Sequence, residues 1–189
     1  MTNFTEEEVA ERKNPAAPYW GADYGLSHLW NEISPGLWVG GTADDDIVAV
    51  AREGKMTMSY GMIVQDDAEI TPDEFDAVVT MYAWARPVDW GVEELRWGIM
   101  DSSDAIPRDE LIDTIEWAWK RWKAGKRVLC RCQAGLNRSS LIAAGVLIRD
   151  GMGATEAINT IRKGRSRKCL FNGSFVDQLN MLEEDYRGV

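Results

Sequence analysis

The chain has 189 residues, with 31 Asp and Glu against 21 Lys and Arg and one His, which gives a formal net charge of −10. Proteins that bind nucleic acid or anionic lipid by neutralising phosphates normally carry a basic excess, so this balance argues against both classes. The length and a hydrophobic content of 45% are typical of one globular domain with a well-developed core.

Cysteine usage and the first residues indicate the compartment. Cys130, Cys132 and Cys169 are too few, and odd in number, for a disulfide-stapled secreted scaffold. The opening MTNFTEEEVAERK lacks the basic start and apolar run of a signal peptide, and no apolar stretch approaches the roughly 18 residues of a membrane span. We therefore expect a cytoplasmic protein, with residues 1–18 as a mobile acidic arm and residues 19–189 as a single domain.

After the arm, segments typical of strands and helices follow one another. In chain order we predict a strand at 36–40, a helix at 44–53, strands at 75–82 and 95–100, a helix at 107–123, a strand at 127–131, and helices at 139–149, 155–163 and 173–186. This alternation favours an α/β fold, with a central, mostly parallel sheet of about four to five strands flanked by helices.

The most informative segment is VLCRCQAGLNRSS, residues 128–140. Cys132 leaves a buried strand, a turn follows with Gly135 at its centre, and Arg138 arrives as a helix begins. Successive N–H groups of a tight turn, together with a helix N-terminus, form a nest for an oxyanion, and a guanidinium matches two phosphate oxygens. The same positive field favours a thiolate, so Cys132 is a candidate nucleophile toward phosphorus.

This segment resembles the cysteine-dependent protein tyrosine phosphatases, specifically the small dual-specificity type of bacterial or bacteriophage kind. The shared signature is Cys-x5-Arg-Ser/Thr between a strand and a helix, matched by Cys132, Arg138 and Ser139. Residues 33–40, 75–80 and 170–179 also resemble family motifs, so the resemblance spans roughly residues 29 to 186. The fold implied is phosphotyrosine protein phosphatase-like.

The resemblance implies a phosphatase that acts on phosphorylated protein through a cysteinyl-phosphate intermediate, with no metal or other cofactor. Cys132 would attack phosphorus, Arg138 would bind the phosphate, and Ser139 would assist departure of the sulfur. The substrate-binding loop would comprise Gln133, Ala134, Gly135, Leu136, Asn137 and Arg138. A shallow cleft is expected, open to phosphotyrosine, phosphoserine or phosphothreonine.

The family also uses an aspartate on a mobile loop to protonate the leaving oxygen. The loop follows the strand that precedes the long helix, where this chain has Asp101 and Asp104. Family spacing favours Asp101, and Asp104 is the alternative. An acid is needed because an alkoxide or phenolate leaves poorly without a proton.

One departure from the family lies next to the nucleophile. The family usually has His there, whereas this chain has Arg131, and its single histidine is His28. We expect the charge of Arg131 to favour the thiolate. Cys130 is either a packed strand residue or a thiol that resolves an oxidised Cys132, and Cys169 leaves the same choice open.

Two further residues are candidates for supporting the loop. Arg165, in the basic run 162–168, is expected to contact the loop or the substrate, and Asn172 is expected to cap the last helix and brace the loop. Residues 115–170 carry 13 Lys and Arg against three acids, so the acidic total conceals a basic half around Cys132.

Three alternatives remain open at this stage. A catalytically weak relative would only bind phosphorylated partners. The same loop also suits sulfur transfer or arsenate reduction, which use a thiolate in an oxyanion nest. Finally, the phosphate could belong to a lipid, a nucleotide or an RNA 5′ end rather than to a protein.

Overall fold

The computed structural model describes residues 30–42, 56–59, 62–65, 75–85, 87–88, 91–104 and 106–187. The predicted arm at 1–18 and the helix predicted at 44–53 lie outside these residues. Among the described residues, no helix combines the length and the apolar composition needed to cross a membrane.

Five strands form the central sheet: β1 (Trp30–Ser34), β2 (Leu37–Gly40), β5 (Ala77–Thr80), β6 (Glu93–Arg96) and β7 (Val128–Arg131). Their order is β1-β2-β7-β5-β6. β1 pairs antiparallel with β2, whereas β2, β7, β5 and β6 run parallel to one another. The carboxyl ends of four strands therefore meet at one edge of the sheet, which is where ligands of such sheets bind.

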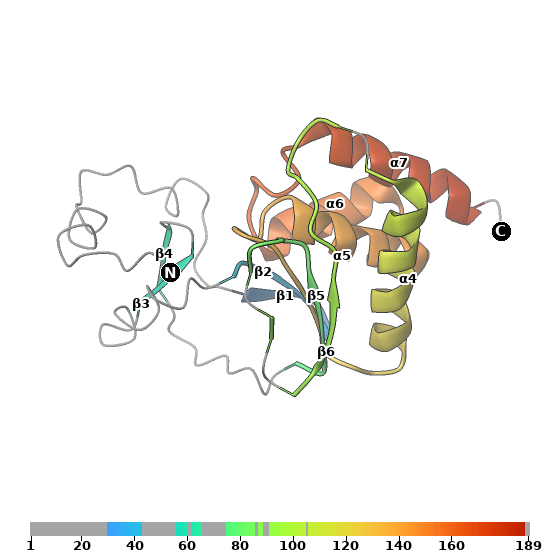
Figure 1. Cartoon of the computed structure of the whole chain (residues 1–189). Helices are drawn as coiled ribbons and strands as arrows, with labels where there is room; N and C mark the ends of the chain where they lie inside the picture. The colour runs from blue at the N-terminus through green and yellow to red at the C-terminus, as the bar shows by residue number, and fades with distance from the viewer. Residues whose placement is uncertain are drawn as a thin grey trace.

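Four helices lie on one side of this sheet: α4 (Arg108–Lys123), α5 (Arg138–Arg149), α6 (Ala154–Gly164) and α7 (Gly173–Arg187) (Figure 1). α5 contacts β2, β7 and the other three helices, and its residues 138–148 are all buried. This central position explains its nearly continuous apolar sequence. Gly145 permits the close approach of α4, because a Cβ there would lie 2.4 Å from Cδ1 of Ile115.

The two faces of the sheet have different cores. The helix side holds the main hydrophobic core, and the opposite face holds a small cluster around Trp30, Phe75, Val78 and Leu129. The rings of Trp30 and Phe75 meet edge to face, with centroids 5.2 Å apart. Because side chains alternate along a strand, Cys130 and Cys132 belong to the helix side, and Leu129 and Arg131 to the opposite face.

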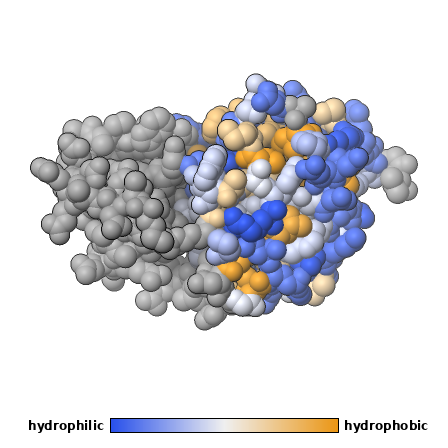
Figure 2. Space-filling view, in the orientation of Figure 1, coloured by the Kyte–Doolittle hydropathy of each residue, from blue (hydrophilic) through white to orange (hydrophobic). Residues whose placement is uncertain are grey.

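The surface in Figure 2 is largely hydrophilic over the coloured region, with hydrophobic residues in small patches. The large hydrophobic side chains that stay exposed among the described residues are Trp84, Met100, Phe171 and Met181. Trp84 follows β5 and Met100 follows β6, so both come after the carboxyl ends of strands. Phe171 precedes α7, and its N–H donates to Asn137 in the loop that follows β7.

The predicted α/β class with a mostly parallel sheet is confirmed, and four predicted helices begin and end within about one residue of the observed ones. The strand predicted at 95–100 is wrong in position, because β6 is Glu93–Arg96. Carboxylates are depleted in strands, but Glu94 is held here by polar partners. β1 and a separate antiparallel pair, β3 (Met56–Ser59) and β4 (Met62–Gln65), were not predicted individually.

Candidate active site

Cys132 stands at the start of the loop that joins β7 to α5, at the carboxyl edge of the sheet. Its side chain is buried, and its Sγ lies 3.3 Å from Oγ of Ser139. The N–H of Gly135 donates to the same sulfur at 3.3 Å. Both contacts suit a sulfur that carries negative charge, because each can supply a donor to it.

The loop is held by its carbonyl groups. Four consecutive carbonyl oxygens, those of residues 133 to 136, accept hydrogen bonds from the surrounding protein. In order, the donors are the N–H of Thr42 (3.2 Å), Nη2 and Nε of Arg165 (3.3 and 3.2 Å), and the N–H of Leu170 (3.0 Å). Because the C=O and N–H of a trans peptide point in opposite directions, these bonds turn the N–H groups of residues 134 to 137 inward. The result is an anion nest above Cys132.

Gly135 meets two constraints at once in this loop. Its φ is +73°, a conformation that side chains resist, and a Cβ there would lie 2.4 Å from the carbonyl carbon of Gly40 at the end of β2. The loop therefore rests against the neighbouring strand with no room for a side chain.

Arg138 lies at the first position of α5 and is buried. Its Nη1 donates to the carbonyl of Ile99 at 3.2 Å, and its Nη2 lies 3.4 Å from Oε1 of Gln133. Nε is buried and has no hydrogen-bond partner among the described residues. Nε and Nη2 form one edge of the guanidinium, and this edge suits two oxygens of a phosphate group.

The structure brings Asp101 to the loop and leaves Asp104 apart from it. Both carboxylate oxygens of Asp101 accept from Nδ2 of Asn137, at 3.2 and 3.0 Å, and Oδ1 also accepts from Asn172 at 3.1 Å. Asp104 instead accepts from the hydroxyl of Ser102 in its own loop, at 3.1 Å. The geometry thus favours Asp101 as the acid beside the nest.

Burial changes the pKa values of three of the predicted accessory residues: an arginine and two cysteines. Arg165 is buried, and burial lowers the pKa of its guanidinium to about 10, so it stays charged at neutral pH. Burial and the nearby Cys132 raise the pKa of Cys130 to about 12, and burial raises the pKa of Cys169, so both are neutral thiols at neutral pH. All three cysteines are free, and no cluster among the described residues is placed to hold a metal ion.

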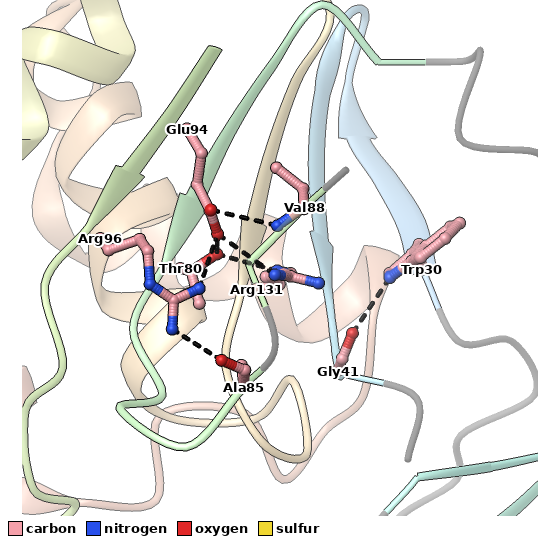
Figure 3. Close-up of polar contacts among 8 residues, drawn as sticks. All are labelled: Trp30, Gly41, Thr80, Ala85, Val88, Glu94, Arg96 and Arg131. Atoms are coloured by element: carbon pink, nitrogen blue, oxygen red, sulfur yellow. Dashed lines mark hydrogen bonds and ion pairs between the residues drawn. The ribbon is translucent and has the colours of Figure 1, made fainter. Parts of the chain in front are cut away.

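Figure 3 shows Arg131 in a polar network with Thr80 and Glu94. Because side chains alternate along a strand, this network lies on the face of the sheet opposite to Cys132. Nε of Arg131 donates to Thr80 at 2.8 Å, and its Nη2 pairs with Oε1 of Glu94 at 3.2 Å. Glu94 also accepts from Thr80, from Arg96 and from the N–H of Val88. Arg131 thus forms an ion pair with the carboxylate of Glu94. This differs from the expectation that its charge favours the thiolate of Cys132.

Sequence reasoning missed the aromatic pair beside Arg138. The ring of Tyr82 lies 5.3 Å from the guanidinium carbon of Arg138, and its hydroxyl accepts from Gln133 at 3.0 Å. The ring of Trp84 is 5.6 Å from that of Tyr82, and its side chain is 73% exposed. The strand-end rule that located Cys132 also applies to β5, so Tyr82 and Trp84, two and four residues beyond Thr80, carried a usable signal.

Comparison with known proteins places the architecture. No protein-family model and no curated protein matches the chain. Solved structures do match, and they show that the fold is that of the small dual-specificity type of cysteine-dependent phosphatase.

Three of these structures illustrate the likeness. PTPMT1 in complex with PI(5)P has a TM-score of 0.62 at 18% identity, covering 85% of this chain and 97% of that one. Human DUSP28 has a TM-score of 0.63 at 20% identity, covering 84% and 98%. Tk-PTP in its active form has a TM-score of 0.60 at 24% identity, covering 82% and 97%. At these identities the similarity establishes a shared fold.

The network in Figure 3 predicts a stability difference between two adjacent glutamates. Glu94→Ala leaves the nearly buried Arg131 without its carboxylate, so we expect a loss of about 3 kcal/mol in the free energy of unfolding, measured in urea. Glu93→Ala is the matched control: Glu93 is 45% exposed and pairs with Arg121 and Lys126, so solvent screens these pairs and we expect a clearly smaller loss. Equal losses would contradict this account.

The same difference depends on pH. Burial opposes ionisation of Glu94, but the hydrogen bonds from Thr80 and Val88 and the charges of Arg131 and Arg96 outweigh it and hold the pKa of Glu94 below its usual range. A lowered pKa gives stability that is complete above the unfolded value of 4.5 and is lost as the pH falls through the folded value. The gap between wild type and Glu94→Ala should therefore shrink in acid.

Proposed function

We propose that this protein is a phosphatase that hydrolyses phosphomonoesters through a cysteinyl-phosphate intermediate. The observation that carries the proposal is the inward-facing nest above Cys132, next to Arg138, whose buried Nε has no hydrogen-bond partner among the described residues. A thiol at the floor of an oxyanion site is placed for attack on phosphorus. The structures of similar fold named as phosphatases support the same reaction class.

The proposed reaction has two displacements. In the first, the sulfur of Cys132 bonds to phosphorus, the P–O bond breaks, and Asp101 gives its proton to the leaving oxygen. The N–H groups of the loop and Arg138 hold the three remaining oxygens. In the second, Asp101 takes a proton from water as the water oxygen bonds to phosphorus, and the S–P bond breaks. Ser139, 3.3 Å from the sulfur, donates a hydrogen bond to the departing thiolate.

We propose phosphorylated protein as the substrate, with phosphotyrosine preferred to phosphoserine and phosphothreonine. The ring of Tyr82 lies beside the guanidinium of Arg138, and the ring of Trp84, which is exposed, lies beside that of Tyr82. A flat aromatic ring attached to the bound phosphate would lie against this pair, and such ring contacts contribute about 0.5–1.5 kcal/mol. PTPMT1 has been solved in complex with PI(5)P. A panel of substrates for this protein should therefore include a lipid phosphate as the competing candidate.

Removal of the nucleophile tests the reaction itself. Cys132→Ser should abolish hydrolysis of p-nitrophenyl phosphate while vanadate still binds, because the nest and Arg138 remain. Cys130→Ser and Cys169→Ser are matched controls, and each should keep most of the activity, since both thiols are neutral and buried. Turnover by Cys132→Ser would refute the mechanism, and loss of activity in both controls would favour dithiol chemistry such as arsenate reduction.

The acid is tested through the leaving group. Phenol is a poor leaving group, with a pKa near 10 like that of tyrosine, whereas p-nitrophenol is far more acidic. Asp101→Asn should lower kcat/KM for phenyl phosphate by about 10²-fold or more, and much less for p-nitrophenyl phosphate. Asp104→Asn, the matched control in the same loop, should change neither. The reverse result would move the acid to Asp104.

The substrate preference is tested at the aromatic pair. Trp84→Ala should lower kcat/KM for a phosphotyrosine peptide roughly 3- to 10-fold and leave the matching phosphoserine peptide nearly unchanged, because only the aryl ring reaches Trp84. Met181→Ala, which removes another exposed apolar side chain on α7, should change neither peptide. Equal losses for both peptides would contradict a role in selecting aryl phosphates.

A further inference from the structure

Asn137 joins three separate segments through one buried amide. It is the last loop residue before α5 and is 1% exposed. Its Oδ1 accepts from the backbone N–H of Phe171 at 3.0 Å and of Asn172 at 3.4 Å. Its Nδ2 donates to both carboxylate oxygens of Asp101. One side chain thus links the predicted phosphate-binding loop (the phosphate loop, residues 133–138), Asp101 and the chain segment before α7.

Asn172 makes the same two kinds of contact: its amide oxygen accepts from the backbone, and its amide nitrogen donates to Asp101. Its Oδ1 accepts from the N–H of Ser174 at 3.1 Å, which caps the start of α7. Its Nδ2 donates to Oδ1 of Asp101 at 3.1 Å and to the carbonyl of Ser102 at 2.7 Å. In both asparagines Oδ1 accepts from backbone N–H groups and Nδ2 donates to Asp101.

Hydrogen-bonding chemistry fixes the orientation of both amides. A backbone N–H can only donate, and an ionised carboxylate can only accept. Rotating either amide by half a turn would set its NH2 against backbone N–H groups and its oxygen against the carboxylate of Asp101. Both contacts would then be repulsive, so each Asn presents Nδ2 to the acid.

The acid has little else to hold it. Asp101 is exposed, and residues 101–104 form bends outside any helix or strand. Misplacement of a reacting group by about 1 Å can cost on the order of 10²-fold in rate. The position of the proposed proton donor therefore depends on the two amides, and through Asn137 on the phosphate loop.

We propose that Asn137 and Asn172 are positioning residues that hold Asp101 for proton transfer, an inference that rests on the proposed function. Asp101 gives its proton to the leaving oxygen and becomes a carboxylate, and the two amides then donate to that carboxylate until it takes a proton from water. Neither asparagine gains or loses a proton. Their role is to place the carboxyl in both steps.

The test uses substitutions of Asn by Asp, which keep the oxygen that accepts from the backbone but remove the nitrogen that donates to Asp101, and one substitution by Ala. Asn172→Asp retains the oxygen that caps α7 but loses the donor to Asp101, and Asn172→Ala loses both without adding charge. Each should raise the ratio of kcat/KM for p-nitrophenyl phosphate to that for phenyl phosphate by about 10-fold or more, because the poor leaving group suffers most. Asn137→Asp should raise the ratio in the same way. Asn172→Ala should also lower the Tm through loss of the cap, and Asn137→Asp should lower it because the new carboxylate is buried beside Asp101.

Two controls separate positioning from general damage. Asn180→Asp makes the same change at an exposed asparagine on α7 and should leave the ratio at its wild-type value. In a double-mutant cycle, Asn172→Asp should add nothing to the ratio once Asp101→Asn is present, because it acts through Asp101.

The outcomes distinguish this inference from the function on which it rests. If Asp101→Asn raises the ratio but all three asparagine variants keep the wild-type value, the positioning role is refuted and the phosphatase assignment stands. Equal losses on both substrates would also refute it and would show a structural role only. If Asp101→Asn itself leaves the ratio unchanged, the acid in the proposed function is wrong.

Discussion

The site depends on the outward anchoring of four loop carbonyls, because this fixes where the N–H groups point. Two of those carbonyls are held by Arg165, a single buried guanidinium that also donates to Asn31 of β1 at 2.5 Å. Burying a charge is costly unless it is paired or fully hydrogen-bonded, and the loop carbonyls supply that compensation. The same bonds that solvate Arg165 thus preorganise the nest, so the N–H groups of the loop are already oriented inward before an anion arrives.

Three buried arginines show how partners, rather than charge, decide a role. Arg165 donates to carbonyls and supports the loop, and Arg131 pairs with Glu94 and joins β7 to β6. Arg138 alone keeps a buried Nε without a partner among the described residues, and its Nη2 lies 3.4 Å from Oε1 of Gln133 in the loop. Alternation along β7 separates these systems: Cys132 faces the helices and Arg131 the opposite side. The net charge of −10 says little about the site, since Arg131, Arg138 and Arg165 all fall within the basic half of the chain.

The sequence was most informative where backbone chemistry and residue type coincide. A cysteine at a strand end, a central glycine and an arginine at a helix start predict the loop between β7 and α5, and the structure has that arrangement. Hydrophobic periodicity located α4 to α7. Glu94 in β6 could not be predicted, because its compatibility with a strand depends on Thr80 and Arg131, which are distant in sequence. The contacts of Asn137 were equally hidden, because an amide shows its partners only in the folded chain.

Three consecutive residues at the start of α5 contact the parts of the site that the proposed reaction uses. Ser139 faces the sulfur, Arg138 anchors the segment before the acid through the carbonyl of Ile99, and Asn137 holds the acid itself. Consecutive helix residues point in different directions, about 100° apart, so three neighbours can reach three separate targets. Because α5 is buried on all sides, its first turn cannot shift without disturbing the core. The proposed nucleophile and the proposed proton donor are therefore both held by one rigid element, although Asp101 lies on an exposed loop.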